Sequence, residues 1–268
     1  MIDLHCHMLP GIDDGAPDLA TALEMARIAV ADGIKVVACT PHIYPGMYEN
    51  TATGIRQAVE DFRLRLAEAD IPLQLTYGAD THLAPDLIAR MRAGEVPTLH
   101  GTRYFLLEPP HHVAPPRLEE FVFNLLAAGY VPIITHPERL SWISSHYTIF
   151  RNMAEHGAWM QITAGSLTGR FGEQVQYWAE LMLDEGQVHI LATDAHGVKG
   201  RAPLLAEGRR AAERWVGAEE ARKLVLDRPK GILDNLDPVK LRLPAAKVPV
   251  VKSGYGFSFW KRWLRRAS

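Results

Sequence analysis

The sequence is poor in cysteine, with only Cys6 and Cys39, which excludes the disulfide framework that small secreted domains use. A single Cys6–Cys39 bridge is the remaining alternative. No apolar run approaches the roughly 18 residues of a membrane-spanning helix, and the N-terminus lacks the basic and apolar regions of a secretory signal. We therefore expect a cytoplasmic protein in a reducing environment.

Basic charge is scarce in most of the chain. Residues 1–246 carry 23 basic and 31 acidic side chains, a net charge of −8. Residues 247–268, in contrast, hold six basic side chains and no acidic one. Because nucleic acids are bound through clustered Lys and Arg, no nucleic-acid partner is expected for the acidic part of the chain.

Short apolar and β-branched runs alternate with longer stretches of helical periodicity. The short runs predict strands at 2–5, 35–39, 73–77, 104–107, 131–135, 159–163 and 188–192. The longer stretches predict helices at about 18–32, 54–69, 84–93, 116–128, 147–156, 173–185 and 202–214, with Asp18 as the N-cap of the first.

Strands that alternate with helices pair in parallel through right-handed crossovers. Seven such units predict an α/β fold, a distorted seven-stranded (β/α)7 barrel. The alternative is a doubly wound open sheet, but no Gly-rich phosphate loop follows the first strand to support it. We expect one domain over residues 1–240 and a basic, aromatic extension over residues 241–268.

Acidic or imidazole side chains follow six of the seven predicted strands. They are His5, His7, His42, Asp80, Glu108, His136, Asp194 and His196. The carboxyl ends of the strands share one face of a parallel barrel, and that face carries the active site. Residues two apart in a strand also point the same way, so His5 and His7 can bind one ion, and so can Asp194 and His196.

This set of side chains predicts a metal site. So many carboxylates and imidazoles would be costly to bury together without a cation. The set contains no thiolate, which disfavours a structural Cys-type zinc site and suits Mn²⁺, Fe²⁺ or catalytic Zn²⁺. Because the ligands are too many for one ion, we expect two or three ions, a cluster that can activate water and bind phosphoryl oxygens.

The motifs also carry a family resemblance. Together, DLHCH, TPH, HPER and TDAH resemble the polymerase-and-histidinol-phosphatase (PHP) superfamily of metal-dependent phosphoesterases. The longer stretches MIDLHCHMLPGIDDGA, QITAGSLTGRFG and ATDAHGVKGR are similar to bacterial manganese-dependent tyrosine phosphatases of capsule and exopolysaccharide operons, the CpsB/YwqE type. The resemblance covers roughly residues 1–235 and implies a PHP-like barrel with three Mn²⁺ ions.

The resemblance also implies which residues bind each ion. The first ion would be bound by His5, His7, Asp194 and a bridging Asp80, the second by Asp80, Glu108 and His136, and the third by Asp14, His42 and His196. Asp80 departs from the family pattern, which usually has Glu there, so either the backbone lies further inward or the bridge is weaker. We expect Asp13 to be a loop or turn residue and His82 to have a surface role.

Two arginines lie where the resemblance places phosphate ligands: Arg139 in HPER, and Arg201 after TDAHGVKG. A planar guanidinium can donate two parallel hydrogen bonds to phosphoryl oxygens. An ordinary surface salt bridge is the alternative for each. Arg170, in LTGRFG, is a third candidate, and a salt bridge or loop anchor explains it equally well.

The implied function is hydrolysis of phosphotyrosine in protein, with a capsule or exopolysaccharide tyrosine kinase as substrate, by attack of a metal-bound hydroxide on phosphorus. A tyrosyl leaving group has a pKa of about 10 and needs little protonation, so His42 or a water near it is the candidate for any acid. Cys6 and Cys39 lack the phosphate-cradling loop of a thiolate mechanism. The alternatives are a small-molecule phosphoesterase of the histidinol-phosphate phosphatase type and a weakly catalytic metal-binding module that docks a kinase.

The C-terminal stretch KSGYGFSFWKRWLRRAS interleaves aromatic and basic side chains. Such a segment can bind an anionic membrane surface, which would place the protein at the inner face of the membrane. The alternatives are packing on the barrel, an unfolded extension, and single-stranded nucleic-acid binding.

Overall fold

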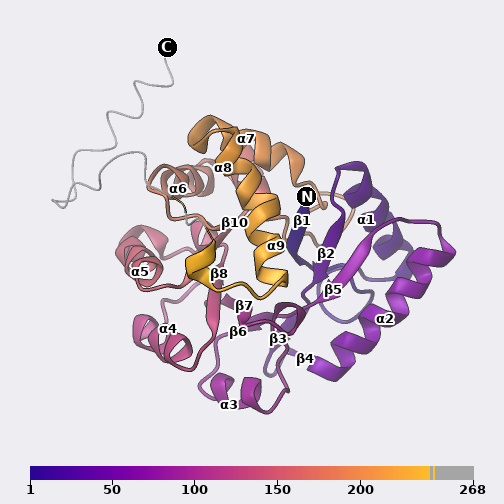
Figure 1. Cartoon of the computed structure of the whole chain (residues 1–268), viewed down its shortest axis with the longest axis horizontal. Helices are drawn as coiled ribbons and strands as arrows, with labels where there is room; N and C mark the ends of the chain where they lie inside the picture. The colour runs from indigo at the N-terminus through magenta and orange to yellow at the C-terminus, as the bar shows by residue number, and fades with distance from the viewer. Residues whose placement is uncertain (242–243, 245–268) are drawn as a thin grey trace.

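The computed structural model describes residues 1–241 and 244, and Figure 1 shows strands at the centre with helices around them. The strands are β1 (Ile2–Cys6), β2 (Val36–Cys39), β3 (His42–Tyr44), β4 (Tyr48–Glu49), β5 (Gln74–Tyr77), β6 (Asp80–His82), β7 (Tyr104–Glu108), β8 (Val131–Thr135), β9 (Trp159–Thr163) and β10 (Ile190–Ala192). The α-helices are α1 (Leu19–Ala31), α2 (Ala52–Glu68), α3 (Leu87–Arg92), α4 (Leu118–Ala127), α5 (Ile143–Glu155), α6 (Glu173–Asp184), α7 (Ala206–Val216), α8 (Ala218–Arg222) and α9 (Arg228–Leu233).

The strands form two sheets, ordered β1-β2-β5 and β10-β9-β8-β7-β6-β3-β4. Every pair is parallel except the β3–β4 hairpin. The chain passes from the first sheet to the second at two places, between β2 and β3 and between β5 and β6. Gly78 N donates to Cys39 O (3.0 Å) and Asp80 N donates to Pro41 O (3.1 Å), so hydrogen bonding continues across both steps.

The outer strands of the two sheets also meet. Cys6 of β1 forms a parallel bridge with Ala195, just after β10. Asp194 N donates to His5 O (2.8 Å), and His7 N donates to Ala195 O (2.9 Å). These backbone bonds place the ends of β1 and β10 side by side.

The inner faces of the strands change character along their length. In β7, buried Tyr104 and Leu106 are followed on the same face by Glu108, and in β9 Trp159 is followed by Gln161. The apolar residues at the amino ends pack in one cluster with Ile232 of α9, which covers this end. The polar residues at the carboxyl ends therefore face the opposite opening.

The predicted α/β class, with parallel strands that alternate with helices, is confirmed. Each of the seven predicted strand positions contains a strand, but seven is too few, because the described residues contain ten. The additional strands β3, β4 and β6 are only two or three residues long and lie just after other segments, so they have no periodicity of their own.

The helical segment at 218–233 was not predicted either; it comprises α8, a π-helix (Lys223–Asp227) and α9. The predicted N-cap is confirmed, since Asp18 Oδ1 accepts a hydrogen bond from Thr21 N (2.8 Å). Within the described residues, no helix has the length and apolarity to cross a membrane. The prediction for the basic, aromatic tail falls outside the described residues, apart from Leu241 and Pro244.

Candidate metal centre

Two imidazoles at the end of β1 face each other through their Nε2 atoms. His5 Nδ1 lies 2.9 Å from Gln161 Oε1, and His7 Nδ1 lies 2.7 Å from Asp13 Oδ2. Both oxygens are acceptors, so each ring places a proton on Nδ1 and leaves Nε2 to hold either a second proton or a cation. The two Nε2 atoms are only 3.1 Å apart, an arrangement that requires a proton or a cation between them.

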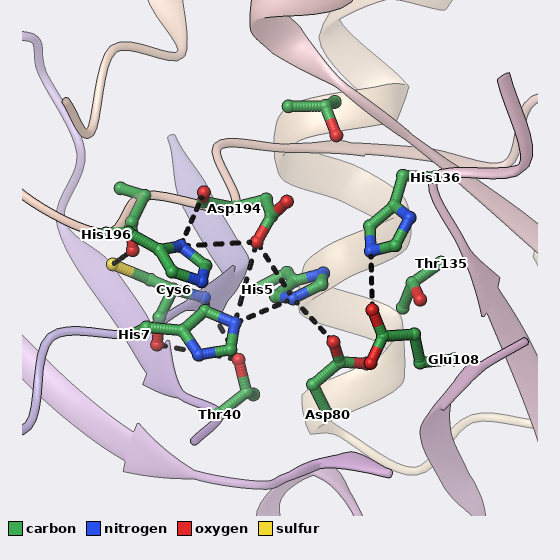
Figure 2. A network of polar contacts seen from close by, with 12 residues as sticks. His5, Cys6, His7, Thr40, Asp80, Glu108, Thr135, His136, Asp194 and His196 are labelled. Carbon is green, nitrogen blue, oxygen red and sulfur yellow. Dashed lines mark hydrogen bonds and ion pairs between the residues drawn. The ribbon is translucent and has the colours of Figure 1, made fainter. Parts of the chain in front are cut away.

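Two buried carboxylates flank this pair. His5 Nε2 lies 3.3 Å from Asp80 Oδ2 and 3.3 Å from Asp194 Oδ1, and Figure 2 shows His5 between them. Burial lowers the pKa of His5, but Asp80 and Asp194 outweigh burial and raise it to about 10. Neither oxygen of Asp80 accepts a hydrogen bond from the described residues. The centre therefore has an excess of electron-pair donors that favours a bound cation.

The distances between these atoms fit metal ligation. Two ligand atoms that each lie about 2.1 Å from one ion are about 3.0 Å apart at a right angle and about 3.4 Å apart at a tetrahedral angle. The three distances around His5 Nε2 lie between 3.1 and 3.3 Å. This side-chain geometry can hold an ion without large rearrangement.

Three groups of side chains in the described residues have the spacing of a metal site. They are His5, His7 and Asp80; His42, Asp80 and Glu108; and His7, Asp14, His42 and His196. In the last group, Asp14 Oδ1 lies 3.4 Å from both His42 Nε2 and His196 Nε2. His7, His42 and Asp80 each belong to two groups, so the groups are contiguous.

His42 and His136 differ from the arrangement that the resemblance implies. His42 Nδ1 lies 3.4 Å from Glu108 Oε2 and 3.5 Å from Asp80 Oδ2, so His42 reaches a second group of carboxylates. His136 Nε2 lies 3.6 Å from Glu108 Oε1, just outside that group (Figure 2). All nine predicted ligands nevertheless converge on one place.

Two of these residues have a strained backbone. His136 follows β8 with φ of 34°, and Asp194 follows β10 with φ of 49°. Residues other than glycine rarely adopt this left-handed backbone conformation, which costs about 1–3 kcal/mol per residue. Packing around the site must offset this cost. The left-handed conformation directs both side chains toward the centre.

Both predicted arginines bind the same carboxylate. Arg139 Nη1 and Arg201 Nη2 donate to Asp194 Oδ2, with the second distance 2.6 Å. The guanidinium of Arg139 also lies over the ring of Phe171, 4.5 Å from its centroid. Burial raises the pKa of Asp194, but His5 and the two arginines outweigh burial and hold it well below its usual range. Asp194 thus presents Oδ1 to the imidazoles and Oδ2 to the guanidinium groups.

Asp13 has contacts beyond the predicted turn. Its Oδ1 accepts from Gly15 N (2.9 Å), which is the expected turn contact. Its Oδ2 accepts from His7 Nδ1 and also from His42 N (3.1 Å). Asp13 therefore orients two candidate ligands, a role that only the adjacency of Asp13 and Asp14 could have suggested.

Glu138 was also missed by sequence reasoning. It is buried, and its Oε1 accepts hydrogen bonds from Thr163 N (2.8 Å) and Ser166 Oγ (2.7 Å). Burial raises the pKa of Glu138 to about 7. These contacts join the HPER segment to Thr163, the last residue of β9 and a neighbour of Arg139, and to Ser166 in the turn that follows. The sequence shows both motifs but not their contact.

Three further predictions have clear outcomes. The surface role expected for His82 is wrong, because its side chain is only 13 % exposed, stacks on Tyr44 and lies 3.7 Å from Glu108 Oε2. Arg170 forms the alternative salt bridge, with Nη2 2.7 Å from Glu207 Oε1. Cys6 and Cys39 are free and buried, and burial raises the pKa of Cys39 to about 12, which argues against a thiolate nucleophile.

Comparison with known proteins identifies the family. Residues 1–234 match the family described as capsular polysaccharide synthesis, CpsB/CapC. The chain belongs to this family. Tyrosine-protein phosphatase YwqE of Bacillus subtilis (strain 168) is 36% identical over 219 residues, which are 82% of this chain and 86% of YwqE. This chain is therefore similar to a tyrosine phosphatase over most of its length.

Solved structures agree with the family match. One comes from work on YwqE of Bacillus subtilis and CpsB of Streptococcus pneumoniae, described as metal-dependent tyrosine phosphatases. It superposes with a TM-score of 0.86 and 33% identity, and covers 93% of this chain and 100% of its own. A histidinol phosphate phosphatase of Lactococcus lactis shares the fold alone, with a TM-score of 0.51 and 14% identity over 82% of this chain and 93% of its own.

Proposed function

We propose that this chain is a metal-dependent tyrosine-protein phosphatase with three adjacent Mn²⁺ sites. The observation that carries the proposal is the pair of facing Nε2 atoms of His5 and His7 between two buried carboxylates, which a cation would satisfy. Membership in a family that includes YwqE supports the same reaction for this chain.

The assignment of ligands follows the three groups of side chains. Asp194 joins His5, His7 and Asp80 at the first ion, and His136 joins His42, Asp80 and Glu108 at the second. The third ion takes Asp14, His42 and His196, with His7 beside them. Because both ring nitrogens of His42 lie near carboxylates, the distances favour a ligand role for His42 over that of a general acid.

We infer further that the two sheets act as one distorted PHP-like barrel around this centre. The bridge between Cys6 and Ala195 and the hydrogen bonds across the β2–β3 and β5–β6 steps support this interpretation. The ligands would then occupy the carboxyl-end mouth, where α/β barrels carry their active sites.

Divalent cations in such a cluster supply a nucleophilic water at neutral pH and neutralise phosphoryl charge. Arg139 and Arg201 approach Asp194 together, so both guanidinium groups border the place where a phosphoryl group would bind. Their donors match phosphoryl oxygens, whose charge is the main demand of phosphoryl transfer. The tyrosinate leaving group, with a pKa of about 10, needs little proton donation from the protein.

The substrate we propose is phosphotyrosine on a protein, in particular on a tyrosine kinase of capsule or exopolysaccharide synthesis. The name of the matched family, capsular polysaccharide synthesis, supports this choice. The tail at 247–268 is proposed to bring the protein to an anionic membrane surface, because it combines six basic with several aromatic side chains.

A direct test strips the protein of metal, restores Mn²⁺ and compares rates on a phosphotyrosyl peptide, a phosphoseryl peptide and histidinol phosphate. We expect Mn²⁺-dependent turnover with kcat/KM at least 10-fold higher for the phosphotyrosyl peptide. Turnover of histidinol phosphate alone would reject the tyrosine-phosphatase assignment. Bound metal without turnover of any substrate would favour the kinase-docking module, and Asp80→Glu would then test whether the short carboxylate limits activity.

A further inference from the structure

The loop between β7 and α4 contains two adjacent histidines, His111 and His112, and its backbone is tied to the segment that follows Arg139. His111 O accepts hydrogen bonds from Ser141 N (3.1 Å) and Ser141 Oγ (3.2 Å). Trp142 Nε1 donates to Pro110 O (2.9 Å). These three bonds fix the position of His111 relative to the arginine.

The imidazole of His111 lies at the edge of the metal centre. Its ring centroid is 6.3 Å from that of His136. Besides burial, the charges of Arg139 and Arg201 act on this ring and lower its pKa, while Asp194 acts in the opposite direction. The charges of both guanidinium groups and of the carboxylate that binds them therefore reach the His111 ring, which lies beside His136.

One nitrogen of His111 lacks a partner. Nδ1 is buried and has no hydrogen bond within the part of the chain that the structure describes. Buried polar atoms are nearly always paired, and an unpaired one in a functional site points to a bound group. The adjacent His112 is exposed, with its ring centroid 5.0 Å from that of His111. His111 therefore has a buried ring nitrogen without a partner among the described residues, whereas the side chain of its neighbour His112 is exposed.

We propose that His111 contacts the phosphoryl group of the substrate and donates a hydrogen bond to it from Nδ1. This inference rests on the proposed function and adds a residue to its phosphate site. A phosphoryl dianion offers only acceptor oxygens, so each contact needs a donor from the protein. Arg139 follows β8 and Arg201 follows β10, and His111 adds a donor from the loop after β7.

The test uses the full chain loaded with Mn²⁺ and compares three variants: His111→Ala, His111→Asn and His112→Ala. Asn keeps a side-chain N–H near the position of Nδ1, and His112→Ala is the matched control from the same loop. Binding of inorganic phosphate is measured by isothermal titration calorimetry, and KM and kcat are measured on a phosphotyrosyl peptide. Thermal melting confirms that each variant is folded.

We expect His111→Ala to weaken phosphate binding about 10-fold, the loss of one hydrogen bond of about 1.4 kcal/mol. His111→Asn should stay within about threefold of the wild type, and His112→Ala within about twofold. KM for the peptide should rise in parallel with the loss of phosphate affinity.

Several results would overturn the inference. Unchanged phosphate affinity in His111→Ala, with or without a fall in kcat, would remove the phosphoryl contact. Equal losses in His111→Ala and His112→Ala would indicate a general effect on the loop, and an Asn variant as weak as the Ala variant would contradict a donor at Nδ1. No phosphate binding by the wild type would overturn it as well. Phosphate affinity that depends on His111 in a protein without phosphotyrosine activity would leave this inference standing and reject the proposed function.

Discussion

Replacing Asp13 by Asn tests whether the carboxylate beside His7 controls metal binding. Asp13 accepts three hydrogen bonds, from His7 Nδ1, His42 N and Gly15 N. An amide has one oxygen, so in either orientation its NH2 group meets an N–H donor. If the NH2 group faces His7, the imidazole must move its proton to Nε2, the atom that would bind the ion.

The size of the effect follows from these contacts. A hydrogen bond to a charged group contributes about 1.5–3 kcal/mol, and 1.4 kcal/mol corresponds to a tenfold change in an equilibrium constant. Loss of a partner that orients a metal ligand costs about 10–100-fold in metal affinity or activity. Because His7 belongs to two of the three groups, we expect Asp13→Asn to lose affinity at more than one ion.

The assay measures the Mn²⁺ concentration that gives half-maximal turnover of a phosphotyrosyl peptide, and the Mn²⁺ retained per chain after dialysis by elemental analysis. We expect a 10–100-fold increase in the first and a decrease in the second. Asp86→Asn is the matched control, since Asp86 is exposed and makes no capping hydrogen bond at the start of α3. Half-saturation within twofold of the wild type would refute the role of Asp13.

Three further predictions concern positions around and beneath the centre. In Gly15→Ala the new Cβ would lie 2.1 Å from His7 O, so we expect Mn²⁺ content and activity to fall at least about 10-fold. The control Gly197→Ala, where the new Cβ has open space around it, should retain both. An active Gly15→Ala protein would contradict this prediction. Phe171→Leu removes the ring under Arg139 and should raise KM about 2–30-fold with little change in kcat, an effect of about 0.5–2 kcal/mol that steady-state kinetics would detect. Burial and Arg228 lower the pKa of His189 to about 3, so between about pH 6.5 and 3 the unfolded chain binds a proton that the folded chain does not, and stability falls as pH falls. Urea unfolding of the metal-free protein should therefore lose up to about 1.4 kcal/mol per pH unit more in the wild type than in His189→Gln, and equal slopes would contradict the assignment.

The convergence of the candidate ligands was predictable because parallel strands end on one side of the sheet. His5 and Asp194, 189 residues apart in a chain of 268, meet because β1 and β10 lie side by side and exchange backbone hydrogen bonds. Arg139 and Arg201 were predicted as phosphate ligands from residue type and resemblance, and both lie on Asp194. The positions of the strand ends determine where these side chains leave the backbone. This is enough to predict which of the candidate residues lie near one another.

The partners within that neighbourhood were not predictable, because sequence spacing does not give distances between loops. Gln161 lies within β9, where alternation predicts only a buried face, yet it fixes the proton on His5. His82 was expected at the surface because no pattern marks the three-residue strand β6 that carries it. The α9 helix that covers the amino end of the strands was also missed, since Pro229 and Gly231 interrupt its helical pattern.

The step between β5 and β6 explains how an aspartate can serve at position 80. After Gly78 the chain leaves the first sheet, and a Cβ at Gly78 would lie 2.7 Å from Leu99 Cδ2, so a larger residue here would require the Leu99 side chain to shift. Asp80 N then donates to Pro41 O, which fixes the start of β6 beside His42. From this backbone position Asp80 Oδ2 already lies 3.3 Å from His5 and 3.5 Å from His42. The shorter carboxylate therefore still lies between the proposed first and second metal sites, and the distances do not require the weaker bridge that the missing methylene suggested.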